Sequence, residues 1–134
     1  DLAFGYRKSS LQAGGRILIS ADLELRLGDP GAIVAAMDDF QKRRKVKQPL
    51  DWPSAGSVFK RPEGHFTGQL IEQAGLKGAR VGDAQVSEHH SGFIVNRGRA
   101  TAAEVIELIR RVQEEVFRRS LVSLVPEIRI IGEE

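Results

Sequence analysis

The sequence predicts an α+β domain with a mixed or antiparallel sheet and about three helices. Residues 17–27 alternate between apolar and polar side chains, which is typical of a strand with one buried face. Residues 101–120 instead repeat apolar side chains at helical spacing. Short β-like runs also follow one another between residues 79 and 98 without a helix between them, which favours α+β over an alternating α/β order.

The composition narrows the class of protein. A chain of 134 residues with 41% hydrophobic residues is long enough for one buried core. The absence of cysteine excludes disulfides, thiolate nucleophiles and cysteine-based metal sites. The net charge of +2 permits an anionic ligand but does not by itself indicate nucleic acid. No run approaches the roughly 18 apolar residues of a membrane span and no signal peptide is visible, so we expect a cytoplasmic enzyme or binding module.

The first elements expected are a strand and a helix. After the strand at residues 17–27, Asp29 is a suitable N-cap and Pro30 suits the first helical position. The helix should end in the basic run at residues 42–47, where cations meet the negative end of the helix dipole. Four apolar residues at helical spacing predict its buried stripe: Ile33, Val34, Met37 and Phe40.

Later segments predict two more helices and several strands. Residues 66–78 indicate a short helix with a glycine stop, and residues 79–98 indicate two short strands, the second being "GFIVN". Thr101 and Glu104 form a capping box for the strongest helix. The buried stripe of that helix is expected at Val105, Ile109, Val112 and Val116. Residues 121–132 contain two β-like runs divided at Pro126.

The loop "QPLDWPSAGSVFKRPEG" at residues 48–64 is the most unusual segment. Its three prolines and two glycines disfavour a helix or a long strand. No GxSxG elbow surrounds Ser57, so the sequence does not indicate a hydrolase nucleophile. Ser57 is either a turn residue or a hydroxyl that faces a ligand. Gly56 allows a ligand to approach the backbone closely, and Lys60 and Arg61 could face phosphate.

Other polar groups support weaker alternatives. Adjacent His89 and His90 point to opposite faces of an extended segment, which disfavours one shared metal and favours a single imidazole touching a ligand. The basic run at residues 42–47 is either a nucleic-acid patch or a solvated helix end. Glu127 and Arg129 would share one face of a strand, as a surface pair or as the wall of a site. No glycine-rich phosphate motif is present.

Five stretches in order carry a resemblance to a known family. They are "FGYRKSS", "QPLDWPSAGSVFKRPEG", "GQLIEQAGLKG", "VSEHHSGFIVNRGRATAAEV" and "LVPEIRIIG". Together they closely resemble the C-terminal part of the UDP-N-acetylenolpyruvoylglucosamine reductases, the flavoenzymes of bacterial peptidoglycan synthesis. The resemblance covers essentially the whole chain. It implies that residues 1–15 end the flavin-binding region and that residues 16–134 form the C-terminal substrate-binding domain.

The resemblance also implies an activity and its cofactors. Members bind FAD mainly through two N-terminal domains, use NADPH as reductant, and convert UDP-N-acetylglucosamine enolpyruvate into UDP-N-acetylmuramate. This chain holds no such flavin-binding half and begins without methionine, so we expect a piece of a longer protein, or one chain of a split enzyme, that is inactive alone. Its expected partners are the flavin-binding domains and the UDP-sugar, with no nucleic acid, membrane or metal.

Matched residue by residue, the resemblance implies roles for the motif residues. Ser57 matches the general acid, Glu127 the catalytic glutamate and Arg7 the arginine that binds the substrate carboxylate. The expected substrate contacts are Tyr6, Lys60, Arg61 and His90, and the expected cofactor contacts are Gly56 and Arg129.

Two departures from the family pattern concern the grip on the UDP group. Many members have asparagine where this chain has Arg61, although arginine can still meet a diphosphate. The short spacing before residue 48 also resembles the subclass without a substrate-clamping loop. The alternative functions are a stand-alone UDP-sugar-binding module without redox activity and, on the basic run alone, a nucleic-acid-binding domain.

Overall fold

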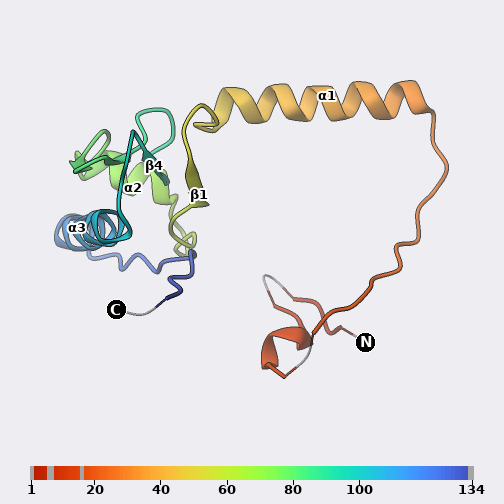
Figure 1. Ribbon diagram of the computed structural model, residues 1–134, viewed down its shortest axis with the longest axis horizontal. Coiled ribbons are helices and arrows are strands. Elements are labelled where there is room, and N and C mark those ends of the chain that lie inside the picture. The colour runs from red at the N-terminus through yellow and green to blue at the C-terminus, as the bar shows by residue number, and fades with distance from the viewer. Residues whose placement is uncertain (1, 6–7, 16, 133–134) are drawn as a thin grey trace. The chain divides into compact units, whose positions relative to one another are not determined.

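The structure is a computed structural model that describes residues 2–5, 8–15 and 17–132. By its internal contacts the chain divides into two compact units, Asp1–Ala35 and Ala36–Glu134. The second unit contains the sheet and the helices that pack on it (Figure 1).

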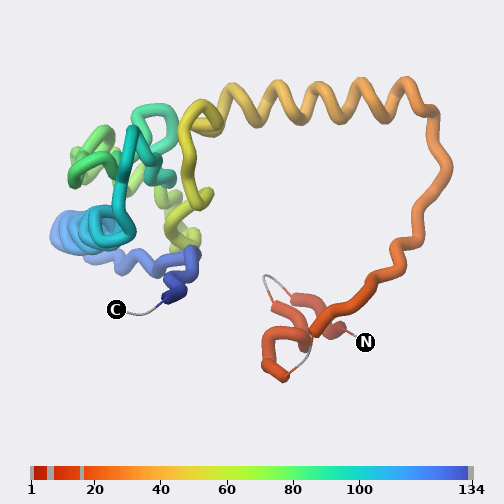
Figure 2. The backbone as a smooth tube through the Cα atoms, viewed as in Figure 1, coloured from red at the N-terminus to blue at the C-terminus, as the bar shows by residue number. Residues whose placement is uncertain are grey.

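The first unit has little regular structure among its described residues. A short 3-10 helix, η1, spans Ser10–Ala13, and residues 17–29 run as an extended trace (Figure 2). The prediction of a strand at residues 17–27 is therefore wrong for this structure. The side chains of Ile17 and Ile19 are 90% and 94% exposed, and no described residue pairs with the segment. Alternation predicts which residues suit a strand, but a strand also needs a neighbour to complete its hydrogen bonds.

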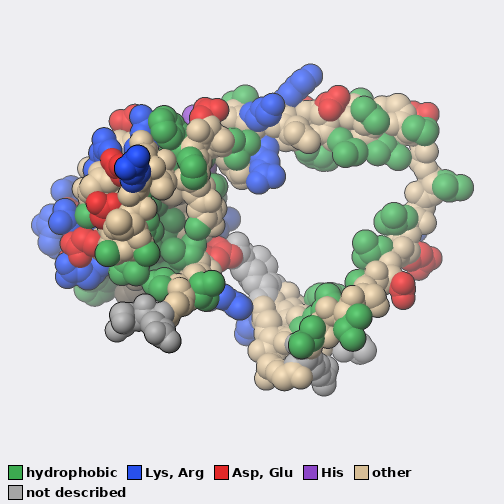
Figure 3. Space-filling model, in the orientation of Figure 1, with side chains coloured by type: hydrophobic (Ala, Val, Ile, Leu, Met, Phe, Trp, Pro, Cys, Tyr) green, Lys and Arg blue, Asp and Glu red, His purple; other side chains and the backbone are tan. Residues whose placement is uncertain are grey.

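The helix α1 spans Pro30–Lys47, as predicted. The carboxylate Oδ1 of Asp29 accepts a hydrogen bond from the Ala32 amide at 2.7 Å, which confirms the N-cap. The predicted buried stripe is wrong, because the side chains of Ile33, Val34, Met37 and Phe40 are all exposed. Figure 3 shows hydrophobic side chains along the surface of this helix. Helical spacing identifies the apolar face but does not supply a surface to cover it.

Four short antiparallel strands form the sheet, in the order β1-β4-β3-β2. They are β1 (Ser54–Ser57), β2 (Arg80–Val81), β3 (Ala84–Val86) and β4 (Phe93–Asn96). The "GFIVN" strand is confirmed as β4, while residues 79–98 contain three strands where two were predicted. The proline- and glycine-rich loop contributes β1, with a bulge or irregularity between Ser54 and Ser57. The predicted β-like runs at residues 121–132 form only one isolated bridge, between Phe59 and Pro126.

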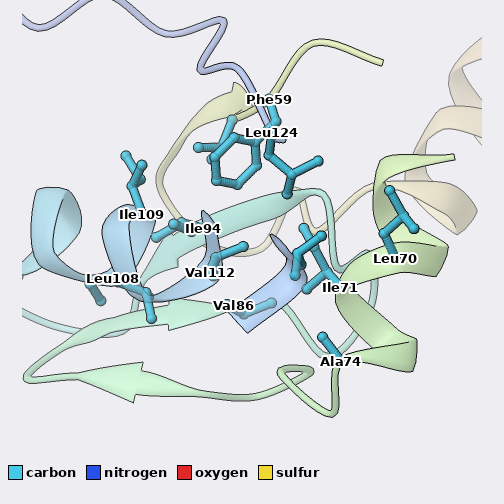
Figure 4. Packing of buried hydrophobic residues seen from close by; sticks show 13 residues of the cluster. Phe59, Leu70, Ile71, Ala74, Val86, Ile94, Leu108, Ile109, Val112 and Leu124 are labelled. Carbon is cyan, nitrogen blue, oxygen red and sulfur yellow. The ribbon is translucent and has the colours of Figure 1, made fainter. Parts of the chain in front are cut away.

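Two helices complete the core. α2 spans Thr67–Gln73 and α3 spans Ala102–Ser120; α3 packs on β2 and β3, and α2 packs on α3. The capping box of α3 is confirmed, since the Thr101 hydroxyl accepts from the Glu104 amide and the Glu104 carboxylate accepts from the Thr101 amide. Of the predicted stripe, Ile109, Val112 and Val116 are buried and Val105 is partly buried against the core. Figure 4 shows Ile109 and Val112 among the buried residues. The α+β class is confirmed.

Candidate functional site

A pocket of about 530 Å³ opens beside β1 and includes Ser57 in its lining. One wall comes from the last turn of α1 and the residues after it, through Arg44, Gln48 and Leu50. The facing wall comes from the sheet, through Gly56, Ser57 and Phe93. The pocket therefore combines a guanidinium, a hydroxyl and apolar surface, which suits a ligand with an anionic part and a ring.

The backbone of the sheet fixes the position of Ser57. Ser57 pairs with Phe93 of β4, and the next amide, that of Val58, donates to the Gly92 carbonyl at 2.9 Å. Ser57 is an exposed residue, and its hydroxyl donates only a long hydrogen bond, 3.5 Å, to the Phe59 carbonyl. A hydroxyl that is exposed and weakly bonded can turn toward a ligand.

Glu127 is brought beside this strand from near the other end of the chain. Its amide donates to the Val58 carbonyl at 2.7 Å, and the Lys60 amide donates to the Val125 carbonyl at 2.8 Å. The Phe59 side chain between these bonds is 2% exposed and anchors the segment in the core. The backbone of Glu127 therefore lies next to the residue that follows Ser57.

His90 and Ser57 lie on the same side of Gly92. A Cβ built at Gly92 would lie 3.0 Å from His90 Cε1 and 3.7 Å from Ser57 Oγ. The Gly92 amide donates to His90 Nδ1 at 3.1 Å, so Nε2 carries the proton in the neutral ring. The ring edge also contacts Phe93, with 5.0 Å between ring centroids. The structure thus brings together three predicted residues: Ser57, Glu127 by its backbone, and His90.

The other predicted site residues are less closely associated with the pocket. The Arg61 guanidinium lies over the Phe66 ring at 4.0 Å, and its Nε donates to the His65 carbonyl at 3.1 Å. The Lys60 and Arg129 side chains are exposed, and residues 127–132 form no strand that would give Glu127 and Arg129 a common face. Tyr6 and Arg7 lie outside the described residues.

Arg44 is the residue that the sequence interpretation missed. The basic run containing it was read as a solvated helix end or a nucleic-acid patch, yet Arg44 lines the pocket. Its Nε donates to Gln48 Oε1 at 2.9 Å, which leaves the two terminal amino groups of the guanidinium for other partners. Its place one turn before the Gln48-Pro49 pair was the available signal, because a chain reversal there returns the helix end toward β1.

The described part of the chain lacks two further features. No three histidine or acidic residues there are grouped so that they could hold a metal ion. No helix there combines the length and apolar character needed to cross a bilayer.

Comparison with known proteins identifies the family. The model of the UDP-N-acetylenolpyruvoylglucosamine reductase C-terminal domain matches residues 48–131. The chain belongs to this reductase family. A UDP-N-acetylenolpyruvoylglucosamine reductase from Levilactobacillus brevis is 54% identical over 134 residues, which are 100% of this chain and 44% of that protein.

Other members of the reductase family also match nearly all of this chain with less than half of their own length. The reductase from Clostridium novyi is 49% identical, again over 100% of this chain and 44% of its own length. A solved UDP-N-acetylenolpyruvylglucosamine reductase from Thermus caldophilus superposes with a TM-score of 0.80 at 44% identity, covering 96% of this chain and 45% of that one. The chain therefore spans less than half the length of the relatives it matches.

Proposed function

We propose that this chain is the substrate domain of a reductase that converts UDP-N-acetylglucosamine enolpyruvate into UDP-N-acetylmuramate for peptidoglycan synthesis in the bacterial cytoplasm. The observation that carries the proposal is the backbone ladder that holds Ser57 and Glu127 together beside a pocket containing Arg44. A purely binding module would not need a proton donor such as Ser57. Residues 1–15 would end the flavin-binding region and residues 16–134 would form the substrate domain.

The residues present are compatible with FAD at the edge of this pocket. Gly56 has φ +89°, and a Cβ built there would meet nothing within 4 Å, so a flat ring can approach its backbone closely. Gly56, with Arg129 as a second contact, would face the flavin, whose other contacts belong to the flavin-binding domains. When bound, FAD supplies the hydride that NADPH provides.

The chemistry assigned to this chain is charge stabilisation and proton transfer. Hydride addition at the β-carbon of the enolpyruvyl group leaves negative charge on the α-carbon and its carboxylate. Arg7 would bind that carboxylate, and a fixed guanidinium in a site that excludes water stabilises the developing enolate. Ser57 would then donate its proton to the α-carbon, and Glu127 would support the enolate through a hydrogen bond in its protonated form or through water.

The remaining contacts would hold the UDP-sugar. The Arg44 guanidinium in the pocket wall suits a diphosphate, because its planar fork can bind two oxygens at once. Lys60 and Arg61 would add positive charge at the pocket's edge, and His90 would present its Nε2–H. Tyr6 is assigned to the same substrate on the family resemblance alone.

The decisive experiment separates the two half-reactions in the full-length protein. Ser57→Ala should lower substrate reduction by about 10²–10⁴-fold, the usual contribution of a positioned acid or base, while reduction of the flavin by NADPH is unchanged. Ser123→Ala, which removes an exposed hydroxyl elsewhere in the same unit, should leave both half-reactions intact. If Ser57→Ala reduces the substrate at the wild-type rate, Ser57 is not the acid.

A stand-alone UDP-sugar-binding module is the alternative, and it predicts a different spectrum. A full-length product that is colourless and binds the UDP-sugar without reducing it would favour this alternative. A yellow product that oxidises NADPH in the presence of the substrate would favour the reductase.

A further inference from the structure

The C-terminal end of α1 leaves the Val46 carbonyl without a donor from its own helix, as is usual in the last turn of a helix. In a continuing helix the Leu50 amide would donate to the Val46 carbonyl. Leu50 instead donates to the Gln48 carbonyl at 2.9 Å, and Pro49 has no amide hydrogen to offer to the preceding turn. The Val46 carbonyl is therefore open to a donor from outside the helix.

His89 supplies that donor from the loop between β3 and β4. Its Nε2 lies 2.6 Å from the Val46 carbonyl oxygen, and since a carbonyl only accepts, the ring nitrogen must donate. The backbone of His89 is fixed as well, because its amide donates to the hydroxyl of Ser87 at 3.1 Å and Ser87 is only 3% exposed. A side chain from 43 residues away thus caps the helix from a well-anchored turn.

The same turn is also attached to the candidate site. The amide of His90 donates to the same Ser87 hydroxyl at 3.2 Å, and the His90 ring lies beside Gly92 and Ser57. On the other side, the helix turn that His89 caps carries Arg44 and Gln48, which form the opposite wall of the Ser57 pocket. One turn therefore contacts both the helix end, through His89, and the sheet, through His90.

We propose that His89 is a positioning residue that holds the end of α1 in place, so that Arg44 and Gln48 form one wall of the Ser57 pocket. This inference rests on the proposed function only for the identity of the ligand. His89 itself does not line the pocket among the described residues, so its effect passes through the helix end. Loss of the bond would free the turn at residues 46–50 and weaken binding without removing any reacting group.

The test uses three variants of the full-length protein: His89→Ala, His89→Gln and Glu88→Ala. Alanine removes the donor. Glutamine keeps an N–H at nearly the same reach and should restore the contact. Glu88→Ala is the matched control, because it removes an exposed side chain from the same turn.

Two measurements decide between positioning and a merely structural role. His89→Ala should raise the KM for UDP-N-acetylglucosamine enolpyruvate by about two- to tenfold, the effect of one exposed hydrogen bond, while kcat changes less than twofold. Hydrogen exchange at the Gln48 and Leu50 amides should accelerate by a similar factor in the absence of substrate. His89→Gln should return both values toward those of the wild type, and Glu88→Ala should change neither.

The outcomes that overturn the inference are distinct from failure of the proposed function. Unchanged exchange in His89→Ala would mean that the bond does not hold the helix end. Faster exchange with an unchanged KM would mean that the helix end does not shape the binding site. A wild-type protein that reduces no UDP-sugar would overturn the proposed function, and exchange alone would then decide whether His89 holds the helix.

Discussion

Substitution of Gly92 by alanine tests the packing that brings His90 and Ser57 together. The new Cβ would lie 3.0 Å from His90 Cε1 and 3.2 Å from Nδ1, inside the optimal carbon contact of about 3.5–4.0 Å. The ring would have to move, although the Gly92 amide and Phe93 both hold it. Overpacking of this kind costs about 1–3 kcal/mol, and because His90 is only half-buried we expect about 1–2 kcal/mol of lost unfolding free energy.

Gly68→Ala is the matched control, because it adds the same methyl group near the same ring. Its Cβ would lie 3.8 Å from His90 Cε1, an ordinary contact, and Gly68 is within α2, where alanine is the better helix former. We therefore expect Gly68→Ala to stabilise the protein by up to about 1 kcal/mol.

The assay is urea-induced unfolding of the full-length protein, read as the shift of the midpoint at constant slope. The reasoning predicts opposite signs for the two variants. In the Gly92→Ala variant, the substrate half-reaction should also slow, because the methyl group would displace the ring of His90, an expected substrate contact, while flavin reduction by NADPH is retained. If Gly92→Ala unfolds at the wild-type midpoint, or if Gly68→Ala is the less stable of the two variants, the predicted clash between a Gly92 methyl group and the His90 ring is refuted.

Three further predictions concern α3. Leu108→Ala should lower the unfolding free energy by about 2–5 kcal/mol in chemical denaturation, because Leu108 is 1% exposed. Ile106 is exposed, so a change in unfolding free energy beyond about 0.5 kcal/mol in Ile106→Ala would contradict this account. Thr101→Ala should cost about 0.5–2 kcal/mol through loss of the capping box, and equal stability of the variant would show that the cap is dispensable. Hydrogen bonds from Arg118 and then Arg119 lower the pKa of Glu115 from 4.5 to about 2, so its contribution to stability is present above pH 4.5 and is lost as pH falls toward 2. In urea titrations over that window Glu115→Gln should therefore show a shallower decline than the wild type, and parallel declines would exclude the effect.

Local signals in the sequence predicted the helices well. The N-cap at Asp29 and the capping box at Thr101 depend only on residues one turn away, so the sequence contains everything that forms them. The stripe at Ile109, Val112 and Val116 was predicted for the same reason.

Features that depend on distant partners were not predictable in the same way. The segment at residues 17–27 has the pattern of a strand but no described partner. β1 forms because β4 offers hydrogen bonds to a short part of a loop whose composition disfavours a long strand. Arg44 lines the pocket because the chain reverses at Pro49. The spacing of residues within α1 does not predict this reversal.

In the candidate site, the sequence supplied residue types and the structure supplied their proximity. Ser57, Glu127 and His90 were predicted from motifs. The structure places the side chains of Ser57 and His90 on the same side of Gly92, and it bonds the backbone amide of Glu127 to the Val58 carbonyl. Their chemical roles stay predictions. The helix cap by His89 had no sequence signal, because it joins residues 43 positions apart.

The ladder between residues 58–60 and 125–127 has a consequence for how this site can evolve. Its hydrogen bonds run between backbone atoms, from the Glu127 amide to the Val58 carbonyl and from the Lys60 amide to the Val125 carbonyl. Ser57, Lys60 and Glu127 are themselves exposed, and the buried core cluster does not include them. Mutations there can change reactivity or ligand preference at little expense in folding, so selection can explore new chemistry on an unchanged scaffold. Phe59, which is buried between these positions, has no such freedom.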